Sequence, residues 1–218
     1  MKISDITVNY IDHCGSDLSV VDAARVSFNK VSELVNGELS SADVKLINYL
    51  AKHKHTSPFN HCFLTVRVKA PIFVARQLVK HKFMPWNETS RRYVQDEPEF
   101  YFPEMWRGKA DNVKQGSSNE AVMLPLENYL ETIKNSLGNY QEALDFGCCA
   151  EQARMLLPQN TMTEWVWSGT LGAFCDMLKL RLDSHTQYET RVVAEKISDI
   201  VKNCFPVSHK ALLESKEM

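Results

Sequence analysis

The chain has 218 residues, 44% of them apolar, which is enough for one domain with a substantial hydrophobic core. Its 25 basic and 27 acidic residues leave a formal charge of -2, so the overall charge gives no reason to expect a nucleic-acid partner. No apolar run approaches the ~20 residues that cross a bilayer, and the segment after Met1 lacks the apolar block of a signal peptide. We therefore expect one domain, residues 1–218, that is soluble and cytoplasmic (in the host cytoplasm if the chain is viral) and has no membrane partner.

Six cysteines are scattered along the chain without a Cys-x-x-Cys pair, which argues against a zinc ribbon or a disulfide framework. Because cysteine is among the most frequently buried residue types, we expect interior thiols with no catalytic role. They are Cys14, Cys62, Cys148, Cys149, Cys175 and Cys204.

The first third of the chain alternates between strand and helix patterns. Residues 6–11 alternate apolar and polar side chains and predict a strand, followed by the turn signal at Gly15. Helical spacing follows over residues 20–28 and 41–52, the second with a serine as its N-terminal cap. The alternation at residues 62–69 predicts a strand with one buried and one wet face.

A helix is expected to begin at Pro71 and to run through Lys80, with Ile72, Ala75 and Val79 on its buried side. The next proline would end it, so the basic residues that follow would lie at a helix end and in a loop. The negative end of the helix dipole stabilises cations at such a position.

The second half of the chain is mainly helical in pattern. Residues 100–103 indicate an extended edge segment, and residues 108–119 a polar loop without chemistry. Residues 120–146 have the spacing of a long helix that Gly147 stops. Strands early in the chain and helices late in it predict an α+β domain. The remaining helices are expected at residues 151–157, 172–182 and 192–204.

Two polar clusters are candidates for chemistry. His53, His55 and His61 lie within nine residues, but Pro58 breaks any helix that would align them and no Asp, Glu or Cys lies at ligand spacing. Ordinary loop or core histidines are therefore favoured over a metal site. The segment 80–93 gathers cations, hydrogen-bonding groups and a carboxylate, which is the composition that an anionic ligand needs. Its basic tripeptide alone would be better explained as a solvated helix end.

With its spacing, this second cluster closely resembles the signature of the flavin-dependent thymidylate synthases, in which Arg-His-Arg is followed by seven residues and a Ser. Here the tripeptide is Lys80-His81-Lys82 and the serine is Ser90. The resemblance implies an antiparallel sheet flanked by long helices, and a reaction that reductively methylates dUMP to dTMP. It also implies FAD as cofactor, NADPH and methylenetetrahydrofolate as co-substrates, and a homotetramer with shared active sites. Further segments that resemble the family are residues 53–61, 70–77, 151–158 and 180–187.

Under this resemblance, cations and hydrogen-bonding side chains bind dUMP together. Arg181 would contact the uracil ring and stabilise negative charge on it, and Arg154 would reach the phosphate across a subunit boundary. From the residues alone, an ion pair of Arg181 with Asp183 or Glu189 is an equally good explanation. The expected dUMP contacts are Gln77, Lys80, Glu88, Ser90, Arg91, Arg92, Arg154 and Arg181.

The resemblance also implies a flavin site, where His55 shapes the flavin and folate side of the pocket. Arg181 and His55 are thus the expected catalytic residues. Ser90 is interpreted as a binding group, because the family's chemistry uses no enzyme nucleophile attached to the uracil. The expected FAD contacts are His55, Ser57, Lys80, His81, Lys82, Glu88, Thr170, Asp176 and His185, and no metal is expected.

The chain departs from the family pattern at several positions. Lys80 and Lys82 keep the charge of the family's arginines but lack the bidentate fork, which costs about 1 to 3 kcal/mol for each lost charge-assisted hydrogen bond. Thr170, Gly172 and Asp176 stand where the family commonly uses Asn, Arg and Asn, and a carboxylate there repels a diphosphate. Two alternatives therefore stay open: a relative that hydroxymethylates dUMP, and a non-catalytic nucleotide- or RNA-binding protein.

Overall fold

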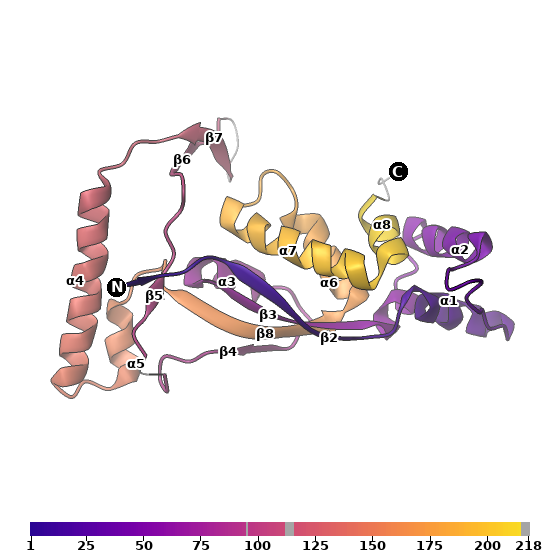
Figure 1. Ribbon diagram of the computed structural model, residues 1–218, viewed down its shortest axis with the longest axis horizontal. Coiled ribbons are helices and arrows are strands. Elements are labelled where there is room, and N and C mark those ends of the chain that lie inside the picture. Colours follow the sequence, from indigo (N-terminus) through magenta and orange to yellow (C-terminus); the bar gives the residue numbers. More distant parts are fainter. Residues whose placement is uncertain (95, 112–115, 215–218) are drawn as a thin grey trace.

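The computed structural model describes residues 1–94, 96–111 and 116–214 (Figure 1). A four-stranded antiparallel sheet forms its centre, with the strand order β2-β3-β8-β4. Helices pack against this sheet, which confirms the predicted α+β class. The strands are β2 (Thr7–Cys14), β3 (Phe63–Pro71), β8 (Met162–Thr170) and β4 (Trp86–Glu88).

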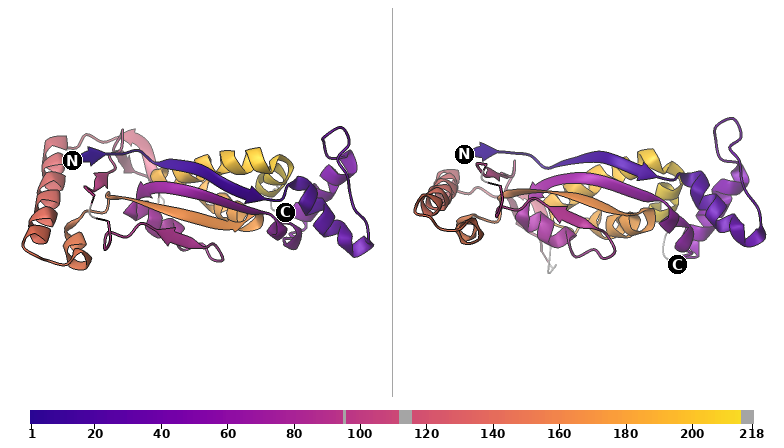
Figure 2. Two further views of the ribbon diagram at one scale, coloured as in Figure 1. Left: turned by 60° about the horizontal axis from the view of Figure 1, so that its bottom comes forward. Right: turned by 90° about the horizontal axis from the view of Figure 1, so that it is seen from below.

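One face of the sheet is covered by helices α6 (Leu171–Arg181) and α7 (Tyr188–Cys204), and Figure 2 shows the other face without a helix over it in the described part of the chain. Strand β3 explains the difference. Leu64, Val66 and Val68 are fully buried under the helices, whereas Arg67 points to the uncovered face and is exposed. The predicted strand with one wet face is confirmed, because its period of two matches the pleat.

Strand β8 is the longest strand that was not predicted from the sequence. It lies between β3 and β4, and its Trp165 and Trp167 are buried. Trp86 of β4 stacks on Trp165 at a ring-centroid distance of 4.3 Å and meets Trp167 edge-on at 5.6 Å. These aromatic contacts explain how a three-residue edge strand stays attached to the sheet.

The N-terminal helices follow the predicted ranges closely. Helix α1 (Asp17–Arg25) continues into a 3-10 turn at Val26–Phe28, and helix α2 (Ser41–Lys52) has the predicted bounds. The hydroxyl of Ser40 accepts a hydrogen bond from the backbone N–H of Asp43 at 3.2 Å, so the serine cap is confirmed.

Helix α3 (Ile72–Leu78) is shorter and differently oriented than predicted. Pro71 still pairs with Met162 as the last residue of β3, so the helix begins one residue later and ends before Lys80. Its buried side consists of Val74, Ala75 and Leu78, and Val79 is 50% exposed. The predicted stripe is confirmed at Ala75 and was wrong at Val79, which follows the last helical residue.

The elements at one end of the molecule are small strands and a long helix (Figure 1). Strands β6 (Arg107–Lys109) and β7 (Ser117–Ala121) form a hairpin, so the loop predicted over 108–119 was wrong at its flanks, while 112–115 lie outside the described residues. Strand β1 (Lys2–Ile3) pairs in parallel with β5 (Glu99–Phe100), which confirms only the start of the predicted edge segment.

Helix α4 (Leu126–Asp145) begins six residues after the predicted start, next to Pro125, and ends just before Gly147, the predicted stop, whose φ is +85°. The last helix was not predicted. The further helices are α5 (Ala150–Ala153), the 3-10 turn Arg154–Leu156, and α8 (Pro206–Glu214). Among the helices described, none is both long and apolar enough to cross a membrane.

Only two of the six thiols are buried, namely Cys62 and Cys175, and desolvation raises their pKa values to about 11 and about 12. Cys14 and Cys149 are exposed, so the expectation of six interior thiols was wrong. Exposed Cys14 lies on β2, an edge strand with most of its side chains in solvent.

Candidate functional site

A polar cluster lies where α6 ends, against the turn that follows α3. Nε of Arg181 donates a hydrogen bond to Nε2 of His81 at 3.1 Å, and a terminal nitrogen of the same guanidinium donates to the backbone oxygen of Gln77 at 3.4 Å. Arg181 forms no ion pair within the described residues, so neither carboxylate considered earlier explains its position. The structure thus brings together Arg181 and Gln77, which the resemblance assigned to dUMP, and His81, which it assigned to FAD.

The protonation state of His81 follows from this contact. An arginine can only donate, so Nε2 of His81 must accept, and the ring is neutral with its proton on Nδ1. Burial and the adjacent Arg181 charge both lower the pKa of His81, and burial lowers the pKa of Arg181. His81 therefore serves as a neutral acceptor that fixes the guanidinium plane.

A cleft of about 900 Å³ opens beside this cluster. Gln77, Arg181 and His185 line it, together with two lysines, Lys80 and Lys179. His185 donates its backbone N–H to Asp183 at 2.8 Å, and this and the imidazole contact at 3.0 Å lower the pKa of Asp183. The volume suits a nucleotide-sized ligand, and the surplus of cations suits an anionic one.

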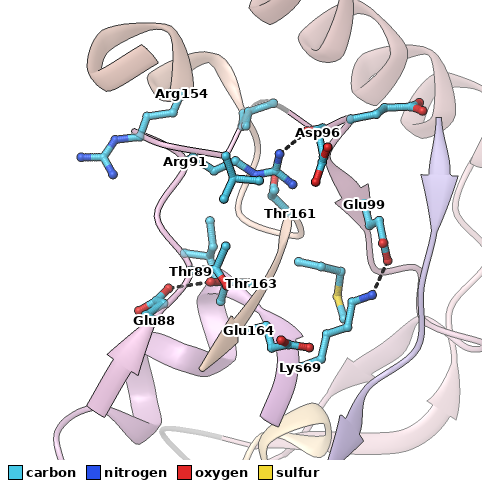
Figure 3. A pocket seen from close by; sticks show the side chains of 15 residues that line it. Lys69, Glu88, Thr89, Arg91, Asp96, Glu99, Arg154, Thr161, Thr163 and Glu164 are labelled. Carbon is cyan, nitrogen blue, oxygen red and sulfur yellow. Dashed lines mark hydrogen bonds and ion pairs between the residues drawn. The ribbon is translucent and has the colours of Figure 1, made fainter. Parts of the chain in front are cut away.

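A second pocket of about 360 Å³ lies beside the end of β4 (Figure 3), and of the predicted residues Glu88, Arg91 and Arg154 line it. Glu88 accepts hydrogen bonds from the hydroxyl of Thr163 at 2.7 Å and from the indole of Trp86 at 3.0 Å. Arg91 donates to the backbone oxygen of Asp96. Arg154 also lines this pocket, and its guanidinium points away from the other labelled side chains in Figure 3.

The neighbouring residues of the signature are held more loosely. Ser90 accepts a hydrogen bond from Nε of Arg92 at 3.1 Å. Arg92 lies 3.9 Å from Glu151 and 5.1 Å from the ring centroid of Tyr93. The Arg92 side chain is 43% exposed, so most of its donors remain available to a ligand.

The predicted flavin residues at the end of α2 form a third group. His55 lies in a ring cluster with Tyr49 and His53, with centroid distances of 6.0 Å to Tyr49 and 6.3 Å to His53. Ser57 begins the following 3-10 helix (Ser57–His61) and is exposed. Exposed rings of this kind can stack on a planar ligand.

Thr170 and Asp176 both have partners inside the protein. The hydroxyl of Thr170 caps α6 by accepting from the N–H of Ala173 at 3.1 Å, and it donates to Oδ1 of Asn60 at 2.8 Å. Asp176 forms an ion pair with Lys179 at 3.2 Å. This pair partly offsets the negative charge that would repel a cofactor diphosphate. A ligand could therefore use only those hydrogen-bonding positions of Thr170 and Asp176 that these contacts do not occupy.

Asn60 is a candidate that the sequence analysis passed over. A Cβ on Gly172 would lie 2.5 Å from its Oδ1, so the glycine leaves the space that the Asn60 amide occupies. The sequence offered a signal for Asn60, because it lies in the same family-like segment as His55 and Ser57.

The side chains of Lys80 and Lys82 are exposed and make no hydrogen bond or ion pair with any residue that the structure describes.

Within one chain, the predicted site residues therefore lie in three separate regions of the fold. His55 and Thr170 lie at one end of the sheet, and Arg154 lies near α5 at the opposite end (Figure 1). The cleft of Arg181 and His81 lies on the helix-covered side. The antiparallel sheet, together with a cleft in which cations outnumber carboxylates, fits the class of proteins that bind anionic small molecules.

Comparisons with known proteins agree with this class. Residues 9–207 match the family model described as thymidylate synthase complementing protein. The flavin-dependent thymidylate synthase of Wolbachia pipientis wMel is 37% identical, over 95% of this chain and 73% of its own length. That of Pseudothermotoga lettingae is 34% identical, over 94% and 89%. The chain belongs to the flavin-dependent thymidylate synthase family.

Solved structures extend the similarity to the fold. The UMP/dUMP methylase PolB from Streptomyces cacaoi, bound with 5-Br UMP, superposes with a TM-score of 0.86 and 31% identity, over 99% of this chain and 97% of that one. Its structure with 5-Br dUMP gives a TM-score of 0.83 and 33% identity. The antiparallel sheet with long flanking helices that the resemblance implied is thereby confirmed.

Proposed function

We propose that this protein methylates dUMP reductively to dTMP, with FAD as cofactor and with methylenetetrahydrofolate and NADPH as co-substrates. The observation that carries this proposal is Arg181, half-buried at a nucleotide-sized cleft and fixed there by His81 and Gln77, in a chain of this family. The whole chain, residues 1–218, would act as one catalytic domain.

In this proposal, Arg181 activates the pyrimidine. Its Nε is used by His81, and its other N–H groups can donate to a uracil oxygen on which negative charge develops. Gln77 and Lys80 line the same cleft and would bind the nucleotide with it. Because the guanidinium is oriented before the ligand arrives, little of the binding free energy is spent on ordering it.

The phosphate would be bound by Ser90, Arg91, Arg92 and Arg154, and Glu88 at the end of β4 would orient the ligand or its neighbours. They line or adjoin a pocket other than the Arg181 cleft of the same chain. We therefore propose that they face the cleft of another copy, in a homotetramer with shared active sites. The exposed guanidinium of Arg154, which points away from its own pocket, supports this arrangement.

The chemistry of the donor set fits a flavin nucleotide. Lys80 and Lys82 are exposed cations that could hold a diphosphate, and the rings around His55 could stack on an isoalloxazine. Bound FAD would supply the two-electron reduction. His55 would shape the flavin and folate side of the pocket. The other residues expected to contact FAD, with smaller contributions to binding, are Ser57, His81, Glu88, Thr170, Asp176 and His185.

The test combines a spectrum with a product mass. Purified protein with added FAD should show a bound-flavin spectrum that dUMP changes, and with all substrates it should release dTMP. A product heavier by one oxygen would support hydroxymethylation, which the altered residues Lys80, Lys82 and Asp176 keep under consideration. A protein that takes up neither FAD nor dUMP would contradict both enzymatic proposals and favour a non-catalytic binding protein.

A further inference from the structure

The carboxamide of Gln77 is the middle of a chain of four side chains. Its Nε2 donates to Oε1 of Gln187, and its Oε1 accepts from the hydroxyl of Thr190 at 3.1 Å. Nε2 of Gln187 in turn donates to Oε2 of Glu189 at 3.0 Å. Gln187 is the residue before α7, and Glu189 and Thr190 lie in its first turn, more than one hundred residues from Gln77.

The chemistry of its two ends fixes the direction of this chain. An ionised carboxylate only accepts, so Glu189 requires the NH₂ group of Gln187 on its side, which turns the oxygen of Gln187 toward Gln77. Gln77 must then offer its own NH₂ group to Gln187. Its oxygen is left facing Thr190, whose hydroxyl can donate. Neither Gln77 nor Gln187 can reverse its side-chain amide without breaking a hydrogen bond.

The surroundings show which atom of Gln77 faces the ligand. Thr190 is fully buried, so Oε1 of Gln77 points into the protein. Gln187 lines the cleft together with Gln77, so Nε2 of Gln77 lies on the cleft side with its second hydrogen still unused there. A donor of known position is therefore presented to whatever fills the cleft.

We propose that Glu189, Gln187 and Thr190 are positioning residues that hold Gln77 as a hydrogen-bond donor to an acceptor oxygen of the bound nucleotide. This inference rests on the proposed function. A phosphate, carbonyl or hydroxyl oxygen satisfies the same donor, and all three occur in dUMP. Without the relay, the amide can rotate by half a turn and present its own oxygen, which repels such an acceptor.

The experiment measures dUMP affinity by titration calorimetry on the FAD-loaded protein, together with KM for dUMP and kcat. Thr190→Val keeps the shape of the side chain but removes the donor, and Thr190→Ser keeps the donor. We expect Thr190→Val to weaken dUMP binding roughly tenfold and to raise KM for dUMP, with kcat at saturating dUMP changed far less. Thr190→Ser should stay within about twofold of the wild type.

Two further variants control for folding. Thr132→Val removes the hydroxyl of an exposed threonine on α4, outside the proposed sites, and should leave dUMP affinity unchanged. Gln187→Met removes the other partner of Gln77 at a half-buried position, so it tests the relay even if Thr190→Val does not fold. We expect it to weaken dUMP binding by a similar factor.

The outcomes separate this inference from the proposed function. If the wild type binds dUMP and the folded Thr190→Val or Gln187→Met variants bind it equally well, the relay has no positioning role. A wild type with no measurable affinity for dUMP would instead overturn the proposed function, and the relay with it. Equal losses of kcat and of dUMP affinity in Thr190→Ser and Thr190→Val would also contradict the inference, because the hydroxyl would then not be the active group.

Discussion

The Arg181 cleft and the pocket beyond β4 contain similar cations that the protein holds in different ways. Arg181 is half-buried, and both His81 and the backbone of Gln77 fix its guanidinium. Arg92 and Arg154 are exposed, and their contacts are with nearby exposed groups: Arg92 with Ser90, Tyr93 and Glu151, and Arg154 with the backbone oxygen of Glu151. The Arg181 guanidinium is preorganised within one chain, whereas the guanidiniums of Arg92 and Arg154 keep N–H donors that a ligand or a second copy could use. This difference supports a site assembled from two copies.

The sharpest test of the preorganised region is Arg181→Ala. Because Arg181 is proposed to stabilise charge that develops only in the transition state, we expect kcat for dTMP formation to fall by roughly 100- to 1000-fold. Arg181→Lys should recover only part of this, since a lysine cannot keep the His81 contact and a second donor in one plane. Unchanged kcat in a folded Arg181→Ala protein would remove Arg181 from the mechanism.

The second region can be tested by mixing two impaired variants and measuring activity at dUMP concentrations below the KM of Arg154→Ala. Arg154→Ala should raise KM for dUMP roughly 10- to 100-fold, because a charge-assisted hydrogen bond to the phosphate is lost. If each site takes Arg181 from one copy and Arg154 from another, co-refolded Arg181→Ala and Arg154→Ala chains should regain activity that neither has alone. No recovery in mixed oligomers, verified by differently tagged chains, would place both residues in one chain's site.

The exposed lysines provide a smaller test, directed at the flavin. Replacing Lys80 and Lys82 by arginine restores the planar fork, so we expect the Kd for FAD to fall by roughly tenfold. Flavin fluorescence during titration measures this directly. Lys45→Arg, an exposed change on α2, is a matched control that should leave the Kd unchanged. Equal FAD affinity in all three proteins would show that these lysines do not contact the cofactor.

The mildest expected effect is a pH dependence at His81. Its pKa in the folded protein lies below the ordinary value of 6.5, so the unfolded chain binds more protons between the two values. The stabilising contact with Arg181 is complete above pH 6.5 and is lost as the pH falls through the folded pKa. We expect dUMP affinity to weaken over the same acidic range, and His81→Asn, which retains an acceptor, to flatten that part of the profile.

Patterns within short segments predicted much of the fold. The helix at residues 41–52 and the strand at residues 62–69 appear as expected, because a serine cap and strict alternation are local signals. Trp165, Trp167 and Gly169 alternate with more polar or exposed positions in the same way, and this pattern could have predicted strand β8. The start of α3 was misplaced because Pro71 remains in the sheet, which depends on its distant partner Met162.

The candidate site was predictable in its membership and not in its contacts. The family-like segments contained Gln77, His81 and Arg181, but the partners of these residues are about one hundred positions away in the sequence. That His81 accepts from Arg181 depends on how α6 returns across the sheet, and no spacing rule reports it. The same is true of Thr190, which a helical pattern alone would assign to the core.

Strand β8 sets a fixed separation between two parts of the chemistry. Thr163 near one end holds Glu88, and Thr170 at the other end holds Asn60. Seven steps of extended chain span about 23 Å, which is longer than a nucleotide monophosphate. One molecule of dUMP therefore cannot touch both ends of this strand in one protomer, and a site that used both ends for dUMP would have to combine two protomers.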